Sequence, residues 1–280
     1  MILHPPVKVN LGLNVLRRRP DGYHDLETVF LPYDRIHDTL EIVAGDDYSR
    51  CSARLFAEYS PAETVQAMTP DGKVMITVFR RGGVDWDPLK DLTVKACLAL
   101  GKDYDLPPLK IFLEKTSPVG AGLGGGSADA SYALRMLSEM FLGGQDSGTL
   151  LPYAASLGSD CAFFLYDTPM FASGRGEILS PVSIPALEGL RMEVVVPQGV
   201  SVSTAEAYGG IVPSVPEMRL EAVLKEPVES WKELLVNDFE KTVFASHPIL
   251  ASIKESLYAK GAVYASMSGS GSALFALFKD

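Results

Sequence analysis

A glycine-rich stretch in the middle of the chain constrains the fold more than any other feature. Glycine occupies five of the eight positions in residues 120–127. Before this stretch, Leu109, Ile111 and Leu113 fall on one face of a predicted strand. After it, apolar residues recur at helical spacing over residues 130–141. The sequence therefore predicts a strand, a glycine loop and a helix, in that order.

A loop in this position is typical of an anion-binding site. Glycine allows positive φ angles and leaves room for a ligand to approach the backbone. The first N–H groups of the following helix have no partner within the helix, and they lie at the positive end of its dipole. Together these features favour a phosphate ligand. The alternative is a flexible surface loop, and the predicted strand and helix on either side argue against it.

Two well-known phosphate loops share part of this pattern. Gly120, Gly122 and Gly125 match the spacing of the dinucleotide-binding motif, which also requires an acidic residue at the end of the next strand. That position falls in residues 142–146, a predicted loop between helices. The P-loop motif requires a lysine, which residues 126–128 lack at the required position. The sequence therefore predicts a third type of phosphate loop.

Composition sets the class of protein. A chain of 280 residues with 47% hydrophobic and 21% charged residues is ordinary for one large core or two closely joined domains. Neither a membrane-spanning run nor the features of a signal peptide are found in the sequence. The three cysteines, Cys51, Cys97 and Cys161, lie too far apart to suggest a disulfide framework or a paired metal motif. We therefore expect a cytoplasmic, reduced protein.

The net charge of −10 makes a nucleic-acid partner unexpected. No membrane partner is expected either, since no apolar run approaches the length of a membrane span. A small anionic ligand is compatible with this charge only if its site is locally positive. The glycine loop and a few lysines can provide such a site.

Periodicity and turn residues indicate the other elements. Strands are predicted over residues 26–33, 38–43, 74–79, 190–196, 263–267 and 273–278, a hairpin over 170–179, and helices over 91–100, 146–157, 201–208 and 249–261. Residues 44–72 give weak signals, and residues 209–228 are predicted to form a loop. Strands followed by helices, with hairpins between them, predict an α+β fold rather than regular βαβ winding.

The first strand, predicted over residues 7–15, has an apolar and a polar face. Lys8, Asn10, Gly12 and Asn14 form the polar face. From the strand alone we favour exposure of this face to solvent over a polar cleft by about two to one, because one solvated face is usual in antiparallel sheets.

Two further segments carry polar or aromatic residues next to turns. Tyr23 and His24 directly follow a predicted Pro-Asp-Gly turn, where an aromatic ring and an imidazole are unusual without a partner. Asp160 follows a helical segment, and its local sequence favours an aspartate that ends the helix or satisfies a turn.

Four motifs give the chain a specific resemblance. Residues 118–130 resemble the Pro-x-x-x-Gly-Leu-Gly-Ser/Gly-Ser motif of the galactokinase, homoserine kinase, mevalonate kinase and phosphomevalonate kinase (GHMP) superfamily. Residues 8–13 with 19–28, residues 157–164 and residues 267–273 resemble, in order, the other motifs of the superfamily members that act on 4-diphosphocytidyl-2-C-methyl-D-erythritol. The resemblance covers essentially the whole chain.

The resemblance implies a two-lobed GHMP-kinase fold. The N-terminal lobe would be like domain 2 of ribosomal protein S5, the C-terminal lobe would be an α/β sandwich, and a cleft would lie between them. Residues 1–168 would form the ATP-binding domain and residues 169–280 the substrate-side domain.

The resemblance also implies a reaction. The γ-phosphoryl group of ATP would move to the C2 hydroxyl of the acceptor, in the non-mevalonate pathway to isoprenoid precursors. Asp160 would be the base, and Lys8 beside it would keep the carboxylate ionised and offset negative charge. Mg²⁺ is expected with ATP, but its ligands are unknown and Ser127 is the one candidate. The residues expected at ATP are Lys115, Pro118, Gly120, Gly122, Leu123, Gly124, Gly125, Gly126 and Ser127.

The acceptor would be held by residues far from the glycine loop in sequence. Asn10 would bind its hydroxyl groups. Tyr23 and His24 would contact the cytosine, one by stacking and one by hydrogen bonding. Tyr208 would be the second aromatic residue of this cytosine clamp, and Thr204 lies in the same substrate-binding segment.

Two other functions stay open at this point. The first is a different small-alcohol kinase of the superfamily, of the homoserine or mevalonate type, although such an enzyme has no use for Tyr23, His24 and Tyr208 around a base. The second is a non-catalytic nucleotide-binding module, against which the presence of both Lys8 and Asp160 argues. The expected partner is a small molecule, and the oligomeric state is either a monomer or a homodimer.

Overall fold

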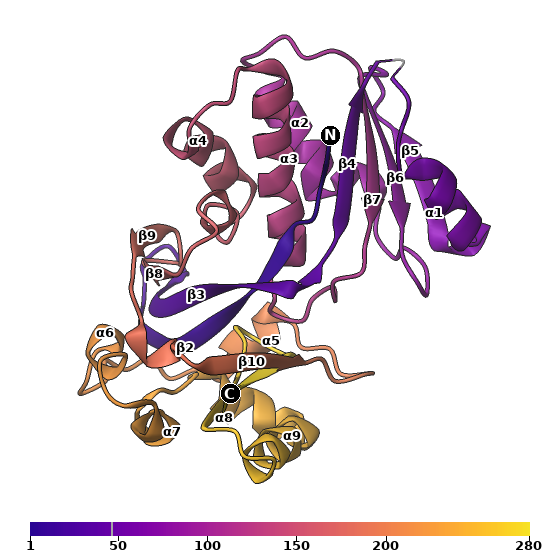
Figure 1. Cartoon of the computed structure of the whole chain (residues 1–280). Helices are drawn as coiled ribbons and strands as arrows, with labels where there is room; N and C mark the ends of the chain where they lie inside the picture. The colour runs from indigo at the N-terminus through magenta and orange to yellow at the C-terminus, as the bar shows by residue number, and fades with distance from the viewer. Residues whose placement is uncertain (46) are drawn as a thin grey trace. The chain divides into compact units, whose positions relative to one another are not determined.

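The chain passes more than once between two structural units. The computed structural model describes residues 1–45 and 47–280 and is drawn in Figure 1. The first unit comprises Met1–Val7, Tyr33–Val119 and Gly125–Asp167, and the second unit comprises Lys8–Pro32, Gly120–Gly124 and Thr168–Asp280. The division at residue 168 into two family domains stays a prediction. In the structure, two segments before residue 168, residues 8–32 and 120–124, fold with the C-terminal part of the chain.

The first unit contains a five-stranded sheet. Its order is β1 (Ile2–Leu3), β4 (Thr39–Ala44), β7 (Leu109–Glu114), β6 (Val74–Phe79) and β5 (Thr64–Met68). β6 and β7 pair in parallel, and the other neighbours pair antiparallel. The predicted strand over residues 74–79 is confirmed. β5 was not predicted, because it lies in residues 44–72, where half-exposed residues give no clear alternation.

Both faces of this sheet are covered. Ile111 and Leu113 of β7 pack in the core with α2 (Leu92–Leu100) and α3 (Gly125–Phe141), which lie on one side of the sheet in Figure 1. Phe112, which points to the other face, packs with Leu55 of α1 (Ser52–Glu58). The period of two therefore places alternate residues of β7 in two separate cores, and burying each such side chain stabilises the unit by about 1.5–3 kcal/mol.

The predicted helix boundaries follow from capping residues. Asp91 caps α2 by accepting a hydrogen bond from the Thr93 N–H at 2.9 Å. Asp146 caps α4 (Ser147–Leu157) in the same way, accepting from the Thr149 N–H at 2.8 Å. Aspartate is favoured at this position because it satisfies an N–H group that the helix leaves without a partner.

The second unit contains two sheets. The first has the order β2 (Pro6–Arg18), β3 (His24–His37), β8 (Met170–Ser173) and β9 (Ile178–Pro181), and the second has the order β10 (Leu190–Val195), β12 (Leu274–Lys279) and β11 (Tyr264–Met267). β2 and β3 lie mainly in this unit. The predicted strands at both ends of the chain and the predicted hairpin are confirmed.

Five helices described in the second unit complete its core. They are α5 (Thr204–Gly209), α6 (Leu220–Val223), α7 (Trp231–Leu234), α8 (Phe239–Ser246) and α9 (Pro248–Ala259). α6 corrects the prediction that residues 209–228 are all loop: this single turn forms because Leu220 and Val223 are buried and the Leu220 N–H donates to Glu27 Oε1 at 3.1 Å. Such tertiary contacts outweigh a weak local propensity.

None of the helices in residues 1–45 and 47–280 combines the length and apolar character that a membrane span requires.

Candidate active site

Lys8 and its neighbours on β2 form a buried polar cluster in the second unit. Lys8 is 3% exposed, and its ammonium donates to Asn10 Oδ1 at 2.5 Å and to the Gly122 carbonyl at 3.0 Å. Asn10 in turn donates through Nδ2 to Thr28 Oγ1 at 3.1 Å. Asn14, farther along the same face, is 6% exposed. The interpretation of this face as solvated is therefore wrong, since its polar side chains are buried and hydrogen-bonded.

The glycine loop meets the C-terminal glycine motif at Gly122. A Cβ atom at Gly122, where φ is +76°, would lie 2.2 Å from the carbonyl oxygen of Ser268. The Ser268 hydroxyl donates to the Gly122 carbonyl at 3.1 Å and accepts from the Asn10 N–H at 3.1 Å. Gly122 is therefore required for close packing of two loops as well as for its backbone angle. Lys8, Asn10, Gly122 and Ser268 consequently form one site.

The turn that carries Asp160 is attached to the helix that follows the glycine loop, within the first unit. The Ser131 hydroxyl of α3 donates to the carbonyl of Cys161 at 2.6 Å and to the carbonyl of Ser127 at 3.0 Å. One side chain thus ties the Asp160 turn to the first turn of α3. Burial raises the pKa of Cys161 to about 11, and the nearby Asp160 carboxylate adds to the shift, so this thiol stays protonated at neutral pH.

Aromatic residues gather in another part of the second unit. His24 stacks on Tyr208, with ring centroids 4.8 Å apart and an interplanar angle of 21°. Tyr208 also meets Phe239 edge-on, at 4.7 Å between centroids. Tyr23 is 57% exposed, and the guanidinium of Arg175 lies 4.9 Å from its ring centroid. The structure therefore pairs Tyr208 with His24 and leaves much of Tyr23 open to solvent.

Lys115, at the end of β7, is held by two carboxylates of the first unit. Its ammonium lies 2.5 Å from Asp38 Oδ2 and 2.6 Å from Asp129 Oδ2. All three side chains are buried. Burial alone would lower the pKa of Lys115, but the two carboxylates outweigh it and raise the pKa above its ordinary value. Lys115 therefore stays charged at neutral pH.

A cavity of about 280 Å³ opens on the first unit beside this lysine. Its lining combines Tyr59, Arg80 and Arg81 with residues 115–119, which lead into the glycine loop. The Arg81 guanidinium lies 4.3 Å from the centroid of the Tyr59 ring. The cavity thus supplies two arginines and an aromatic face in a chain whose net charge is −10.

No metal centre is formed by the histidine, cysteine, aspartate and glutamate side chains of residues 1–45 and 47–280, because no three of them are grouped to hold an ion. Ser127, in the first turn of α3, stays the one predicted contact for Mg²⁺.

Comparison with known proteins identifies the family. The model of the GHMP kinase N-terminal domain matches residues 91–168, and that of the GHMP kinase C-terminal domain matches residues 220–280. A 4-diphosphocytidyl-2-C-methyl-D-erythritol kinase of Bacteroides fragilis is 43% identical over 279 residues, covering 99% of this chain and 92% of that protein. Its namesake in Bacteroides thetaiotaomicron is 42% identical over 280 residues, covering 100% of this chain and 92% of the relative. The chain belongs to the 4-diphosphocytidyl-2-C-methyl-D-erythritol kinase family.

Solved structures agree with this family. A crystal structure of 4-(cytidine 5'-diphospho)-2C-methyl-D-erythritol kinase superposes with a TM-score of 0.74 at 30% identity, covering 99% of this chain and 90% of that one. A mevalonate kinase structure superposes with a TM-score of 0.67 at 13% identity, covering 100% of this chain and 91% of that one, and shows the shared fold alone. The predicted α+β GHMP-kinase fold and the prediction of a kinase are confirmed.

The predicted site residues of this family member fall in both units. The second unit contains Lys8, Asn10, Tyr23, His24, Gly120, Gly122, Leu123, Gly124, Thr204 and Tyr208, and the first contains Lys115, Pro118, Gly125, Gly126, Ser127 and Asp160. The structure brings Lys8, Asn10 and Gly122 together, it brings His24 and Tyr208 together, and it ties the Asp160 turn to Ser127. The role of each residue stays a prediction.

Two groups of residues near the candidate site were not predicted from the sequence. Asp38 and Asp129, which hold Lys115, are distant from it in sequence, so no local pattern could reveal them. Arg80 and Arg81 had a signal: they are consecutive arginines at the end of a strong strand and are followed by two glycines.

Proposed function

We propose that this chain transfers the γ-phosphoryl group of ATP to the C2 hydroxyl of 4-diphosphocytidyl-2-C-methyl-D-erythritol. The products are the 2-phosphate and ADP, in the non-mevalonate route to isoprenoid precursors. The observation that carries this proposal is the near-full-length similarity to relatives named for this reaction. The buried Lys8–Asn10 cluster and the aromatic group around Tyr208 support it.

Phosphoryl transfer depends on positioning and on charge stabilisation more than on covalent help from the protein. Asp160 accepts the proton of the C2 hydroxyl while that oxygen forms its bond to the γ-phosphorus. The bond between the γ-phosphorus and its bridging oxygen breaks, and ADP leaves. The Lys8 ammonium offsets the negative charge of the transition state, and its hydrogen bonds to Asn10 and Gly122 hold it in place for this task.

The ATP phosphates bind at the start of α3. The first N–H groups of this helix, from Gly125 to Ser127, face the phosphates at the positive end of the helix dipole. A Cβ atom at Gly126 would meet no atom within 4 Å apart from its chain neighbours and the backbone of its own helix, so this position leaves open space beside the backbone. Mg²⁺, when bound with ATP, neutralises phosphate charge, and the Ser127 hydroxyl is a candidate contact for it. The cavity beside Arg80 and Arg81 accepts another part of the nucleotide.

The acceptor binds through its cytosine and its hydroxyl groups. Tyr23 offers an exposed ring face for stacking, and His24 and Tyr208 offer a hydrogen-bonding group and a second ring. Asn10 and Thr204 contact the rest of the acceptor. We also keep the prediction of a cytoplasmic protein, because its three cysteines are free thiols that are all buried. The prediction of a monomer or a homodimer is kept as well.

A coupled assay for ADP release tests this proposal. The purified protein is given ATP, Mg²⁺ and 4-diphosphocytidyl-2-C-methyl-D-erythritol, with mevalonate and homoserine as alternative acceptors. We expect turnover with 4-diphosphocytidyl-2-C-methyl-D-erythritol and none with mevalonate or homoserine. Absence of ADP release with that acceptor, or faster release with another, contradicts the assignment.

The variant Asp160→Asn tests whether Asp160 is the base in the phosphoryl transfer. It keeps the size of the side chain and removes the base, so kcat falls by about 10²–10⁴-fold while ATP still binds. Normal turnover by this variant excludes Asp160 as the base.

A further inference from the structure

The glycine loop leaves the first unit after residue 119 and returns to it at Gly125, so two separate segments fix its ends. The outgoing segment, Lys115 to Ser117, follows β7. The returning segment is the start of α3. The loop itself contacts Lys8 and Ser268 of the second unit, while the two segments at its ends are held to each other within the first unit.

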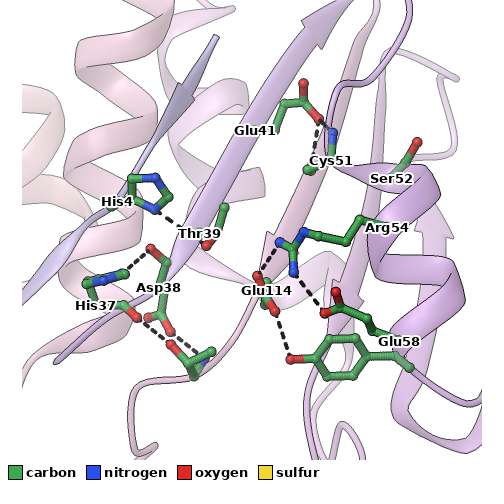
Figure 2. Close-up of polar contacts among 12 residues, drawn as sticks. His4, His37, Asp38, Thr39, Glu41, Cys51, Ser52, Arg54, Glu58 and Glu114 are labelled. Carbon is green, nitrogen blue, oxygen red and sulfur yellow. Dashed lines mark hydrogen bonds and ion pairs between the residues drawn. The ribbon is translucent and has the colours of Figure 1, made fainter.

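Asp38 holds the outgoing segment. This residue is 0% exposed and lies just before β4; it is labelled in Figure 2. Its Oδ1 accepts from the N–H groups of Thr116 and Ser117, each at 2.7 Å. Its Oδ2 accepts from the Ser117 hydroxyl at 2.6 Å and from the Lys115 ammonium at 2.5 Å. One carboxylate thus makes four hydrogen bonds to three consecutive residues, which fixes the backbone before the loop.

Lys115 connects this segment to α3. Besides Asp38, its ammonium donates to Oδ2 of Asp129, which is 1% exposed and lies in α3. A charge-assisted hydrogen bond between buried partners is among the stronger polar contacts, because water cannot compete for either group. The ammonium therefore bridges the segment before the glycine loop and the helix after it.

Gly125 allows the two segments to approach closely. A Cβ atom at this position would lie 2.3 Å from Ser117 Oγ and 3.1 Å from the Lys115 Nζ. Cβ atoms essentially never come within 3.0 Å of an unbonded heavy atom, so a side chain at Gly125 would displace Ser117 and push the two segments apart. The absence of a side chain at Gly125 therefore allows the start of α3 to approach Ser117 and Lys115.

We propose that Asp38, Lys115 and Asp129 act as a positioning cluster that fixes the glycine loop for ATP binding, and that Lys115 acts by bridging two carboxylates and not as a phosphate ligand. Asp129 Oδ1 is buried without a hydrogen-bond partner among the described residues, so the Lys115 contact is what holds this carboxylate. The inference rests on the proposed function for the identity of the ligand, ATP.

The direction of the change in ATP affinity shows whether Lys115 bridges the two segments or contacts a phosphate directly. Asp129→Leu has a side chain of similar size and removes the acceptor from Lys115. If Lys115 bridges the two segments, ATP binding weakens roughly tenfold, because a small displacement of positioned groups is costly. If Lys115 contacts phosphate directly, its release from Asp129 leaves ATP binding unchanged or tighter, and this result would overturn the proposal.

A conservative variant and a milder variant complete the series. Asp129→Asn keeps an oxygen that accepts from Lys115, so we expect its ATP affinity to stay within about threefold of the unmodified protein. Ser117→Ala removes one hydrogen bond to Asp38, and we expect a loss of about threefold to tenfold in ATP affinity. If Asp129→Leu does not fold, an unchanged affinity in Ser117→Ala overturns the proposal. Lys110→Met, on the strand that precedes Lys115, is the control and leaves ATP affinity unchanged.

The measurements are ATP binding by calorimetry, the KM values for ATP and for the acceptor, and hydrogen exchange of residues 118–124. In Asp129→Leu we expect the KM for ATP to rise, the KM for the acceptor to change less than about twofold, and exchange to accelerate in the loop. Equal changes in both KM values would indicate a general loss of structure and contradict a positioning role. Failure of the unmodified protein to bind ATP would contradict the proposed function instead.

Discussion

Two buried lysines lie near the glycine loop in this chain, and they have different surroundings. Within its own unit, Lys8 donates to an amide oxygen and a carbonyl oxygen, two contacts that orient the ammonium and do not themselves neutralise it. Lys115 donates to two carboxylates, which do neutralise it. The amide and carbonyl contacts fix the orientation of the Lys8 ammonium, whereas the two carboxylates tie Lys115 to two segments of the first unit. Both lysines are buried, so burial alone does not show which of them acts on the substrate.

The largest expected effect is on stability. Lys115→Met leaves two buried carboxylates without their cation, and breaking such a group from one side costs about 3–5 kcal/mol of unfolding free energy. Lys8→Met removes at least the hydrogen bonds to Asn10 Oδ1 and to the Gly122 carbonyl, and we expect a cost of about 1–3 kcal/mol. Urea unfolding of both variants measures the difference. Equal losses in the two variants would break the comparison.

The next effect is on catalysis. In Lys8→Met we expect kcat to fall by about 10²–10³-fold, the usual cost of removing one group that stabilises transition-state charge. ATP binding in this variant stays close to that of the unmodified protein. Steady-state kinetics together with calorimetry checks this prediction. If Lys8→Met loses ATP affinity and keeps its kcat, the assignment of roles to the two lysines is reversed.

A smaller effect concerns the acceptor. Tyr23→Ala removes an exposed ring that we expect to stack on cytosine, and the KM for the acceptor rises roughly tenfold, since stacking on a base contributes about 1–3 kcal/mol. The KM for ATP does not change. Tyr48, which is 93% exposed, offers the control Tyr48→Ala. A parallel rise in both KM values after Tyr23→Ala would place this residue outside the acceptor site.

The smallest effect comes from a partly exposed ion pair in the first unit. Figure 2 shows Glu114 with Arg54, and the Tyr59 hydroxyl also donates to Glu114 at 3.0 Å. Burial favours a higher pKa for Glu114, but the hydrogen bonds from Arg54 and Tyr59 outweigh it and lower the pKa below 4.5. The folded state therefore binds this proton more weakly than the unfolded state, and the resulting stability is present above pH 4.5 and is lost as the pH falls through the folded pKa.

The corresponding variant is Glu114→Gln. At pH 7 we expect it to be less stable by up to about 1 kcal/mol, because the Arg54 side chain is 47% exposed and solvent screens the pair. The difference from the unmodified protein shrinks as the pH is lowered below 4.5. Urea unfolding at several pH values measures it. A difference that grows on acidification would show that the pKa of Glu114 is raised. The effect of burial on this pKa would then be larger than the effect of the hydrogen bonds from Arg54 and Tyr59.

Local sequence determined the elements with strong periodicity or clear caps. The strand over residues 74–79, the helix that Asp91 caps and the order of strand, glycine loop and helix all follow from neighbouring residues, because hydrophobic alternation and capping act over a few positions. The four motifs identified the family for the same reason, since each is a local pattern. The short strand β5 and the single turn α6 were missed because tertiary contacts, and not local propensity, hold them.

Tertiary structure alone decided which groups surround the charged residues. The sequence favoured a solvated face for Lys8 and Asn10, and folding instead buried both beside Gly122 and Ser268, which are more than one hundred residues away in the chain. It also placed Asp38 and Asp129 on either side of Lys115, although nothing in their local sequence indicates a partner. The physical reason is that the energy of a charge depends on which groups surround it and on how much water remains, and only the folded chain determines both.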